Sequence, residues 1–378
     1  MRVITRQLAK EILFSSGFVL IALVALFAFF DLVGQLDDVA TAARSCRPSH
    51  LRPTLPARIY EVMPLAALLA SVYTMSRWAA TSEFTCLRVA GMSPVTLALS
   101  LMLPGIILVG ITYTFGEFIA PAASRYAAEV KSISNNQTTR TARGYSSGVW
   151  VRDVTTGERG LEIDRYINVK YLNATDSAET GGWRLFEFDK QGRIRVFIES
   201  ESAHFEPGKG WLLKDVVRYD YPVFDAADNK PLESRIEMTK ADELLLHSSL
   251  GPDTLSVMTV KPDTMSMRDL DRYVSHLKKN NQQSEHYEVA FWNKAFYPLA
   301  TLVMIALSMP FAYMNARSGG LAIKMFVGVM IGIVFYALNN LFSYLGVLNT
   351  WSPIVVSLVP TVSMLIMAAV AMFLVERR

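Results

Sequence analysis

Six apolar runs, each long enough to cross a membrane as a helix, constrain this chain more than any other feature. A transmembrane helix needs about 20 predominantly apolar residues to cross the hydrocarbon core. The expected spans are residues 13–33, 57–78, 94–120, 288–314, 319–346 and 351–374. The first run could also be a signal peptide. Its apolar stretch is longer than the apolar region of a signal peptide, and acidic residues follow it, so an uncleaved anchor is favoured. We therefore predict a membrane α-helical protein with six transmembrane helices.

The polar middle of the chain carries a different pattern. Residues 122–265 contain no apolar run long enough to span a membrane, and short alternating segments are separated there by glycine and proline turns. Many short strands at such spacing are typical of a sandwich or jellyroll. We expect an inserted all-β, jellyroll-like domain. The residues expected in its apolar interior are Val149, Val151, Leu185, Phe197 and Leu212.

These patterns divide the chain into three parts. Residues 1–121 hold the first three spans, residues 122–265 the β domain, and residues 266–378 an amphipathic connecting helix followed by the last three spans. Apolar residues recur at helical spacing along one face of the connecting helix. They are Leu270, Tyr273, Val274 and Leu277.

Basic residues in the short loops orient the spans, because cytoplasmic loops carry an excess of lysine and arginine. Most of these residues fall on the side of the N-terminus: Arg2, Arg6, Lys10, Arg77, Arg88, Arg317, Lys324, Arg377 and Arg378. Both termini are therefore expected in the cytoplasm and the β domain on the outer side. The loop after the first span is an exception to this rule. It holds Arg44, Arg47, Arg52 and Arg58.

The short polar segment that joins the second and third spans is expected to form a helix at about residues 82–91, on the cytoplasmic side. Thr81 or Ser82 can cap its start, and Glu83 then lies in the first turn, where an acid is favourable. Gly91 suits the C′ position that ends a helix. The segment is either an ordinary connection or a helix that docks into a cytoplasmic partner. Its candidate contact residues are Ser82, Glu83, Phe84, Leu87, Arg88 and Gly91.

Known catalytic and nucleotide-binding motifs are absent from the sequence. It contains no GxxxxGK[ST], H-E-x-x-H, C-x-x-C or G-x-S-x-G pattern. The run from Glu199 to His204 holds residue types found in hydrolases, but alternation along a strand would point them to opposite faces. We therefore predict no catalytic residue, no metal site and no cofactor bound by this chain. The net charge of +3 is too small to indicate nucleic-acid binding.

Polar and small residues within the apolar runs suggest contacts between helices. Glu117 and Lys294 lie at the outer ends of their spans, where they either pair with each other or reach the headgroups. Gly328 and Gly332 form a GxxxG pattern, which allows two helices to approach closely.

Several short motifs, taken in order, resemble one known family. They are MPLAALLA at 63–70, SE at 82–83, AGM at 90–92, GEFIAP at 116–121, RYVSHLKKNNQ at 272–282, the W-x-K-x-x-x-x-P pattern at Trp292, Lys294 and Pro298, and GIVFYALNNLF at 332–342. Over nearly its whole length the chain resembles the LptF/LptG (YjgP/YjgQ) permeases of the bacterial lipopolysaccharide exporter, and it is nearer to the LptG branch. It departs from the family after the first span, where Asp31, Asp37 and Asp38 stand in place of lysines.

The resemblance implies a permease subunit that extracts lipopolysaccharide from the bacterial inner membrane and passes it to a periplasmic bridge. It implies an LptF-like partner permease, two copies of an LptB-like ATPase that binds ATP and Mg²⁺, a membrane-anchored LptC-like protein and an LptA-like bridge. The segment at 82–91 would then be the coupling helix that sits in a groove of the ATPase. The alternatives are the paralogous LptF subunit, a non-transporting envelope docking protein and a membrane-anchored envelope enzyme.

The resemblance also implies a lipid-binding cavity that the first and fifth spans border together with the partner permease. The apolar candidates for its lining are Phe27, Phe30, Phe335 and Tyr336. Arg52 and Arg58 are the candidates for binding lipid phosphates, because guanidinium groups bind phosphate through two parallel hydrogen bonds. The alternative for these arginines is pairing with the aspartates after the first span or with Glu61.

Overall fold

The computed structural model shows two compact units, Met1–Ala127 together with Glu285–Arg378, and Ala128–Ser284. The structure describes residues 2–41, 55–124, 126, 139–141, 148–156, 162–173, 178–189, 191–222, 235–248, 250–252, 254–255, 262–280, 282–313, 320–348 and 351–377. Contacts group the connecting helix with the strands, whereas the sequence pattern grouped it with the last three spans.

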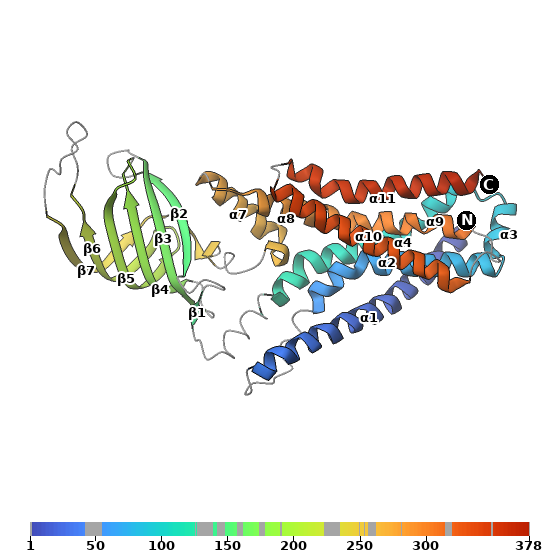
Figure 1. The fold of residues 1–378 in the computed structure, drawn as a ribbon, viewed down its shortest axis with the longest axis horizontal. Coiled ribbons are helices and arrows are strands. Elements are labelled where there is room, and N and C mark those ends of the chain that lie inside the picture. The colour runs from blue at the N-terminus through green and yellow to red at the C-terminus, as the bar shows by residue number, and fades with distance from the viewer. Residues whose placement is uncertain are drawn as a thin grey trace. The chain divides into compact units, whose positions relative to one another are not determined.

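The first unit is a bundle of helices. Among the residues that the structure describes, six stretches are long and apolar enough to span a membrane: Ile4–Val33, Leu55–Ala80, Pro94–Ser124, Glu285–Tyr313, Leu321–Leu348 and Pro353–Val375. They belong to α1 (Arg2–Thr41), α2 (Leu55–Ala80), α4 (Pro94–Thr114), α8 (Glu285–Leu307), α9 (Met309–Tyr313), α10 (Leu321–Leu348) and α11 (Pro353–Glu376). The predicted six transmembrane helices are confirmed. The start of α1, the end of α11 and the short helix α3 (Glu83–Val89) lie at one end of this bundle (Figure 1).

Helix α2 is central to the bundle, because α1, α4, α8, α9 and α10 all contact it. Two glycines let α10 approach it closely. A Cβ atom at Gly332 would overlap Leu65 Cδ1, and one at Gly328 would lie 3.2 Å from Leu69 Cδ2. The GxxxG pattern therefore marks a close helix contact, as the sequence indicated. The outward faces of α1, α10 and α11 remain largely exposed and apolar.

The second unit is built on one antiparallel sheet. Its strands are β1 (Thr139–Thr141), β2 (Val149–Thr156), β3 (Glu162–Asn173), β4 (Glu179–Phe188), β5 (Ile194–Glu206), β6 (Gly210–Asp220) and β7 (Glu237–Leu246). The order in the sheet is β1-β3-β4-β5-β6-β7, and β2 also pairs with β3. From β3 onward each strand therefore pairs with the next one in sequence. The predicted all-β insertion between the third and fourth spans is confirmed.

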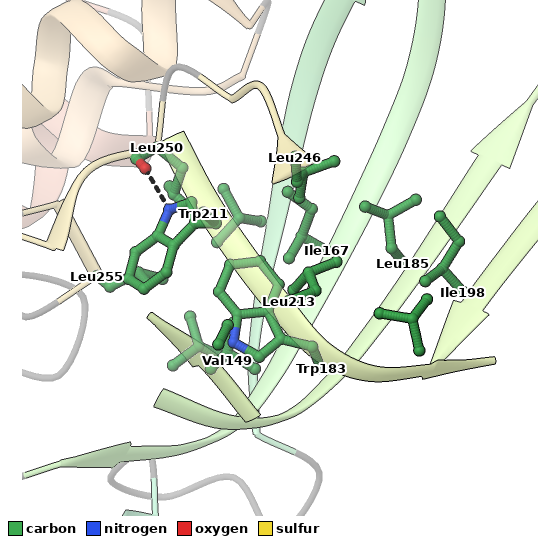
Figure 2. Close-up of a cluster of buried hydrophobic side chains, with 14 of the residues drawn as sticks. Val149, Ile167, Trp183, Leu185, Ile198, Trp211, Leu213, Leu246, Leu250 and Leu255 are labelled. Carbon is green, nitrogen blue, oxygen red and sulfur yellow. Dashed lines mark hydrogen bonds between the residues drawn. The ribbon is translucent and has the colours of Figure 1, made fainter. Parts of the chain in front are cut away.

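One face of the sheet carries the apolar core of this unit, which Figure 2 shows in close-up. Trp183 and Trp211 are its largest fully buried side chains, and their ring centroids lie 5.0 Å apart. Trp211 Nε1 donates a hydrogen bond of 2.7 Å to the carbonyl oxygen of Leu250. The indole therefore ties the segment after β7 to the sheet and satisfies a buried polar group at the same time.

The predicted interior residues divide between the two faces of the sheet. Three of them lie in the core as expected: Val149, Val151 and Leu185. The prediction was wrong for Phe197 and Leu212, because their neighbours along the strands face the core and side chains alternate. Phe197 instead stacks on the opposite face, with its ring centroid 5.7 Å from that of Tyr219.

Helix α7 (Met267–Lys279) is the amphipathic connecting helix. Its N-cap is Ser266, whose side chain accepts a hydrogen bond from the backbone N–H of Asp269. Its buried residues are Leu270, Tyr273, His276 and Leu277. Val274 is only half-buried, and the buried histidine was not expected from the apolar spacing.

Asn280 fastens the end of α7 to the sheet. Its Oδ1 accepts a hydrogen bond of 2.9 Å from the backbone N–H of Val154 on β2, and its Nδ2 donates one of 3.0 Å to the His276 carbonyl oxygen. Burial lowers the pKa of His276, Lys279 adds to this shift, and Asp153 opposes it. The neutral imidazole is therefore the form that the folded unit favours.

Acidification is expected to loosen α7. Because the pKa of His276 is lower in the folded state, its contribution to stability is complete above its ordinary value of about 6.5 and is lost as the pH falls through the folded-state pKa. Hydrogen exchange of α7, corrected for the intrinsic pH dependence, should accelerate between pH 7.5 and pH 5.5. The neutral variant His276→Gln should show much less of this acceleration, and an equal acceleration in that variant would contradict the assignment.

Candidate functional site

The short helix α3 joins α2 to α4, where the sequence predicts a helix. Ser82 occupies its N-cap with a left-handed φ of 62°, and its side chain makes no capping hydrogen bond. Thr81 instead donates its hydroxyl to Glu83 Oε1 at 3.1 Å and to the Arg77 carbonyl oxygen at 3.1 Å. Neither hydroxyl therefore caps the helix in the expected way, although Glu83 does lie in the first turn.

The end of α3 is defined by Gly91. Its φ of 91° is one that residues with a Cβ rarely adopt. Gly91 donates its N–H to the Arg88 carbonyl oxygen, and Met92 donates to that of Leu87, both at 3.0 Å. These two bonds form a Schellman motif, and Met92 and Leu87 supply the apolar contact that accompanies it. The predicted helix end at Gly91 is confirmed.

The inward face of α3 is anchored to its own bundle. Phe84 is buried, and its ring meets that of Tyr313 edge-on at a centroid distance of 4.9 Å. The Arg88 guanidinium lies 5.0 Å from the centroid of the same tyrosine ring, a cation–π contact. Leu87 is half-buried in the same apolar cluster. These contacts connect α3 to α9 across 200 or more residues of sequence, so α3 cannot tilt without disturbing α9.

The outward face of α3 is open. Glu83 is exposed there together with Ser82 and Gly91, and Arg88 is also exposed beside its contact with Tyr313. Val89 is 85% exposed although its side chain is purely apolar. The sequence interpretation did not include Val89, which is the last residue of α3. The exposed carboxylate of Glu83 can complement a basic residue of another protein.

One carboxylate on α1 binds the end of α2 that directly precedes α3. Glu11 Oε2 accepts a hydrogen bond of 2.8 Å from Trp78 Nε1 and pairs with Arg77 Nη2 at 3.0 Å. Both partners lie in the last turn of α2, directly before α3. Nothing in the local sequence patterns indicated that these three residues meet.

At the other end of α1, Arg58 forms an ion-pair cluster. Its Nε and Nη2 donate to the two carboxylate oxygens of Asp31 at 3.1 and 3.0 Å. Its Nη1 donates to Glu61 Oε2 at 2.8 Å, and its guanidinium lies 6.0 Å from the centroid of Phe27. Of the two alternatives for this arginine, the structure therefore shows pairing with the acids.

Other residues predicted from the same part of the sequence lie outside the described part of the chain. Arg44, Arg47 and Arg52 are among them, and so are the side chains of Asp37 and Asp38.

The apolar lipid-binding candidates are not gathered on one surface. Phe27 is half-buried beside Arg58, and Phe30 on the same helix is exposed. Tyr336 on α10 is also exposed, whereas Phe335 is buried in a cluster that includes α2, α8 and α11. Helices α1 and α10 both contact α2. Phe335 therefore stabilises the bundle itself, and the other three remain available to a ligand or a partner.

The helix end at residues 115–119 has an unusual backbone. The π-helical turn Phe115–Ile119 contains Gly116, where a Cβ atom would lie 2.6 Å from Tyr60 Cε2. Glu117 in this turn and Lys294 on α8 are both buried, so neither extends to the headgroups as one of the alternatives supposed. Among the described residues, no group of histidine, cysteine and acidic side chains is arranged to hold a metal ion.

Comparisons with known proteins agree with this architecture. The family described as "Lipopolysaccharide export system permease LptF/LptG" matches residues 6–375. The chain is 26% identical over 370 residues to "Lipopolysaccharide export system permease protein LptG" of Escherichia coli K12, covering 96% of this chain and 95% of that protein. It is 24% identical over 367 residues to the protein of the same name from Haemophilus influenzae, with 96% of each covered.

Proposed function

This chain belongs to the LptF/LptG family of lipopolysaccharide export permeases, and we propose that it extracts lipopolysaccharide from the inner membrane for transfer to a periplasmic bridge. The observation that supports this proposal most strongly is the match of residues 6–375 to that family. The protein is thus a permease subunit, and the family match together with six apolar helices among the described residues makes it a multi-pass protein of the inner membrane.

We propose that α3 is the element through which an LptB-like ATPase drives this permease. The start of α1 and the end of α11 lie at the same end of the bundle as α3, which supports placing all three in the cytoplasm (Figure 1). The outward face of α3 carries Glu83 and Val89, while Phe84 holds its inward face against the bundle. A movement of α3 would therefore be transmitted to α2 and α4, and through Tyr313 to α9.

The partners proposed for this chain are an LptF-like permease, two LptB-like ATPases, an LptC-like anchored protein and an LptA-like bridge. The exposed apolar faces of α1, α10 and α11 are consistent with contact to membrane lipid or to another permease. ATP and Mg²⁺ belong to the ATPase in this proposal. The β unit is proposed to lie in the periplasm, where its apolar interior would guide the acyl chains.

The proposed lipid site lies at the end of α1 that holds Asp31. Phe27 and Phe30 would contact acyl chains there, and Tyr336 on α10 would contact them on a separate surface, since each retains exposed apolar surface. Arg58 would bind a lipid phosphate by exchanging Asp31 for it, because its guanidinium now engages that carboxylate with two hydrogen bonds. Arg52 is proposed as a second phosphate ligand on the sequence argument alone.

Purification of the tagged chain from its native membranes tests the proposal. We expect an LptF-like permease and an ATPase in twofold molar excess over this chain to co-purify. The reconstituted complex should release lipopolysaccharide to a soluble acceptor only when ATP is hydrolysed. Two results would contradict the function in transport. One is a chain that purifies without any ATPase, and the other is a complex that releases lipid at the same rate with and without ATP.

A further inference from the structure

A groove of about 440 Å³ lies between the beginning of α1 and the end of α2. It is separate from the proposed lipid site, which lies at the opposite end of α1. The side chains that give it its chemistry are Gln7, Lys10, Phe14 and Ser15 from α1, and Tyr73 and Arg77 from α2. Gln7, Lys10 and Phe14 are spaced three and four residues apart, and Ser15 lies four residues after Glu11, so they lie on neighbouring positions of one helix face.

The groove lies at the depth of lipid headgroups. The apolar stretch Ile4–Val33 has 30 residues, which as a helix is about 45 Å long, whereas the hydrocarbon core is about 30 Å thick. Each end of this stretch therefore extends beyond the hydrocarbon. Lys10 is about 9 Å along the axis from Ile4, so it lies close to the boundary between headgroups and acyl chains.

The charge of the groove is positive and is concentrated on Lys10. Glu11 is the acidic residue that lines the groove. Its carboxylate already accepts a hydrogen bond from Trp78 and forms an ion pair with Arg77. Lys10 is exposed, and it forms no ion pair with any residue in the part of the chain that the structure describes. Ser15 and Tyr73 add hydroxyl groups, and Gln7 adds an amide. This set of donors suits an anionic phosphate group.

An apolar row continues from the groove along α1. Phe14, Phe18 and Ile21 are 81%, 72% and 71% exposed, and their spacing of four and three residues places them on one face of the helix. The row leads from the headgroup depth towards the middle of the span. A ligand with a charged head and an apolar tail would meet matching surface along its whole length.

We propose that this groove binds the headgroup of an anionic phospholipid, with one acyl chain along Phe14, Phe18 and Ile21. Basic pockets between transmembrane helices are known to hold anionic headgroups. A free phosphate ion shares the headgroup chemistry, but it would make no use of the apolar row. The site is additional to the transport function, because it lies away from the cluster of Asp31 and Arg58.

Native mass spectrometry of the full chain, purified with its co-purifying subunits, tests the proposal. Phosphatidylglycerol should bind in preference to phosphatidylcholine, and Lys10→Gln should weaken its binding about tenfold, as expected on losing one charge-assisted hydrogen bond. Arg6→Gln is the matched control, because Arg6 is an exposed cation on the same helix that does not line the groove. It should change binding less than about twofold. Equal losses in both variants would indicate general attraction to the helix end and would overturn the site.

Two further measurements separate a lipid from a phosphate ion. Phe14→Ala should weaken phosphatidylglycerol binding severalfold, because it removes apolar contact with the acyl chain. Inorganic phosphate at millimolar concentration should not displace the lipid. Displacement by phosphate, or phosphatidylglycerol binding that is unchanged in Phe14→Ala, would overturn the assignment to a phospholipid. Equal binding of phosphatidylcholine would show that the groove does not select anionic lipid.

Discussion

The Glu83→Lys variant is expected to reach the membrane folded but to lose the association of this permease with its ATPase. Glu83 is exposed at the start of α3, where its carboxylate can pair with a basic residue of the partner in addition to accepting from Thr81. A hydrogen bond to a charged group contributes about 1.5–3 kcal/mol, which corresponds to about 10- to 150-fold in affinity. Reversing the charge replaces this attraction with repulsion, so the loss should be at least that large. Pull-down of the ATPase and ATP-dependent release of lipopolysaccharide measure it.

The isosteric variant Glu83→Gln controls for the helix itself. Lysine at the start of a helix opposes the macrodipole by about 0.3–1 kcal/mol, whereas glutamine is neutral there. The thermal stability of both purified variants should stay close to that of the parent, and Glu83→Gln should lose less association than Glu83→Lys. Normal ATPase association and lipid release in Glu83→Lys would refute the coupling role of α3.

The Trp211→Ala variant is expected to unfold the β unit at much lower denaturant than the parent. Trp211 is fully buried in the core of the sheet, and replacing a buried tryptophan by alanine costs about 3–5 kcal/mol. Leu212→Ala is the matched control, because this neighbour points to the other face and is only half-buried. It should cost less than about 1.5 kcal/mol. Hydrogen exchange of β5 and β6 in the full chain, followed against urea, measures both changes.

The conservative variant Trp211→Phe separates packing from hydrogen bonding. Phenylalanine keeps an aromatic ring in the core, but it leaves the buried Leu250 carbonyl oxygen without the donor that Trp211 Nε1 supplies. An unsatisfied buried acceptor costs about 1–3 kcal/mol. We expect stability between those of the parent and Trp211→Ala. Similar losses in Trp211→Ala and Leu212→Ala would show that the two faces have been assigned wrongly.

Features that depend on local chemistry could be predicted from the sequence. The six spans follow from the length of each apolar run, since a run of that length has no other favourable place than a bilayer. The end of α3 follows from Gly91, because its left-handed φ disfavours residues with a Cβ. Helix α7 follows from apolar residues at helical spacing, although its buried His276 does not.

The two faces of the sheet show why a periodic pattern is not sufficient. Alternation tells which residues of a strand share a face, but it does not tell which face is covered. Leu212 and its neighbour Leu213 are chemically identical, and only the packing of the strand places Leu213 in the core. The aromatic side chain of Phe197 likewise has enough partners on the open face to remain there.

What the sequence determined by itself is therefore the number of spans, the inserted β unit, the C-terminal end of α3 and the family. Only the tertiary structure decided that Arg58 engages Asp31, that Phe84 faces Tyr313 and that Glu11 joins the end of α2. The physical reason is that each of these contacts joins residues far apart in the chain. A charge or an aromatic ring can satisfy itself with any suitable neighbour, and the packing of the helices selects which neighbour it meets.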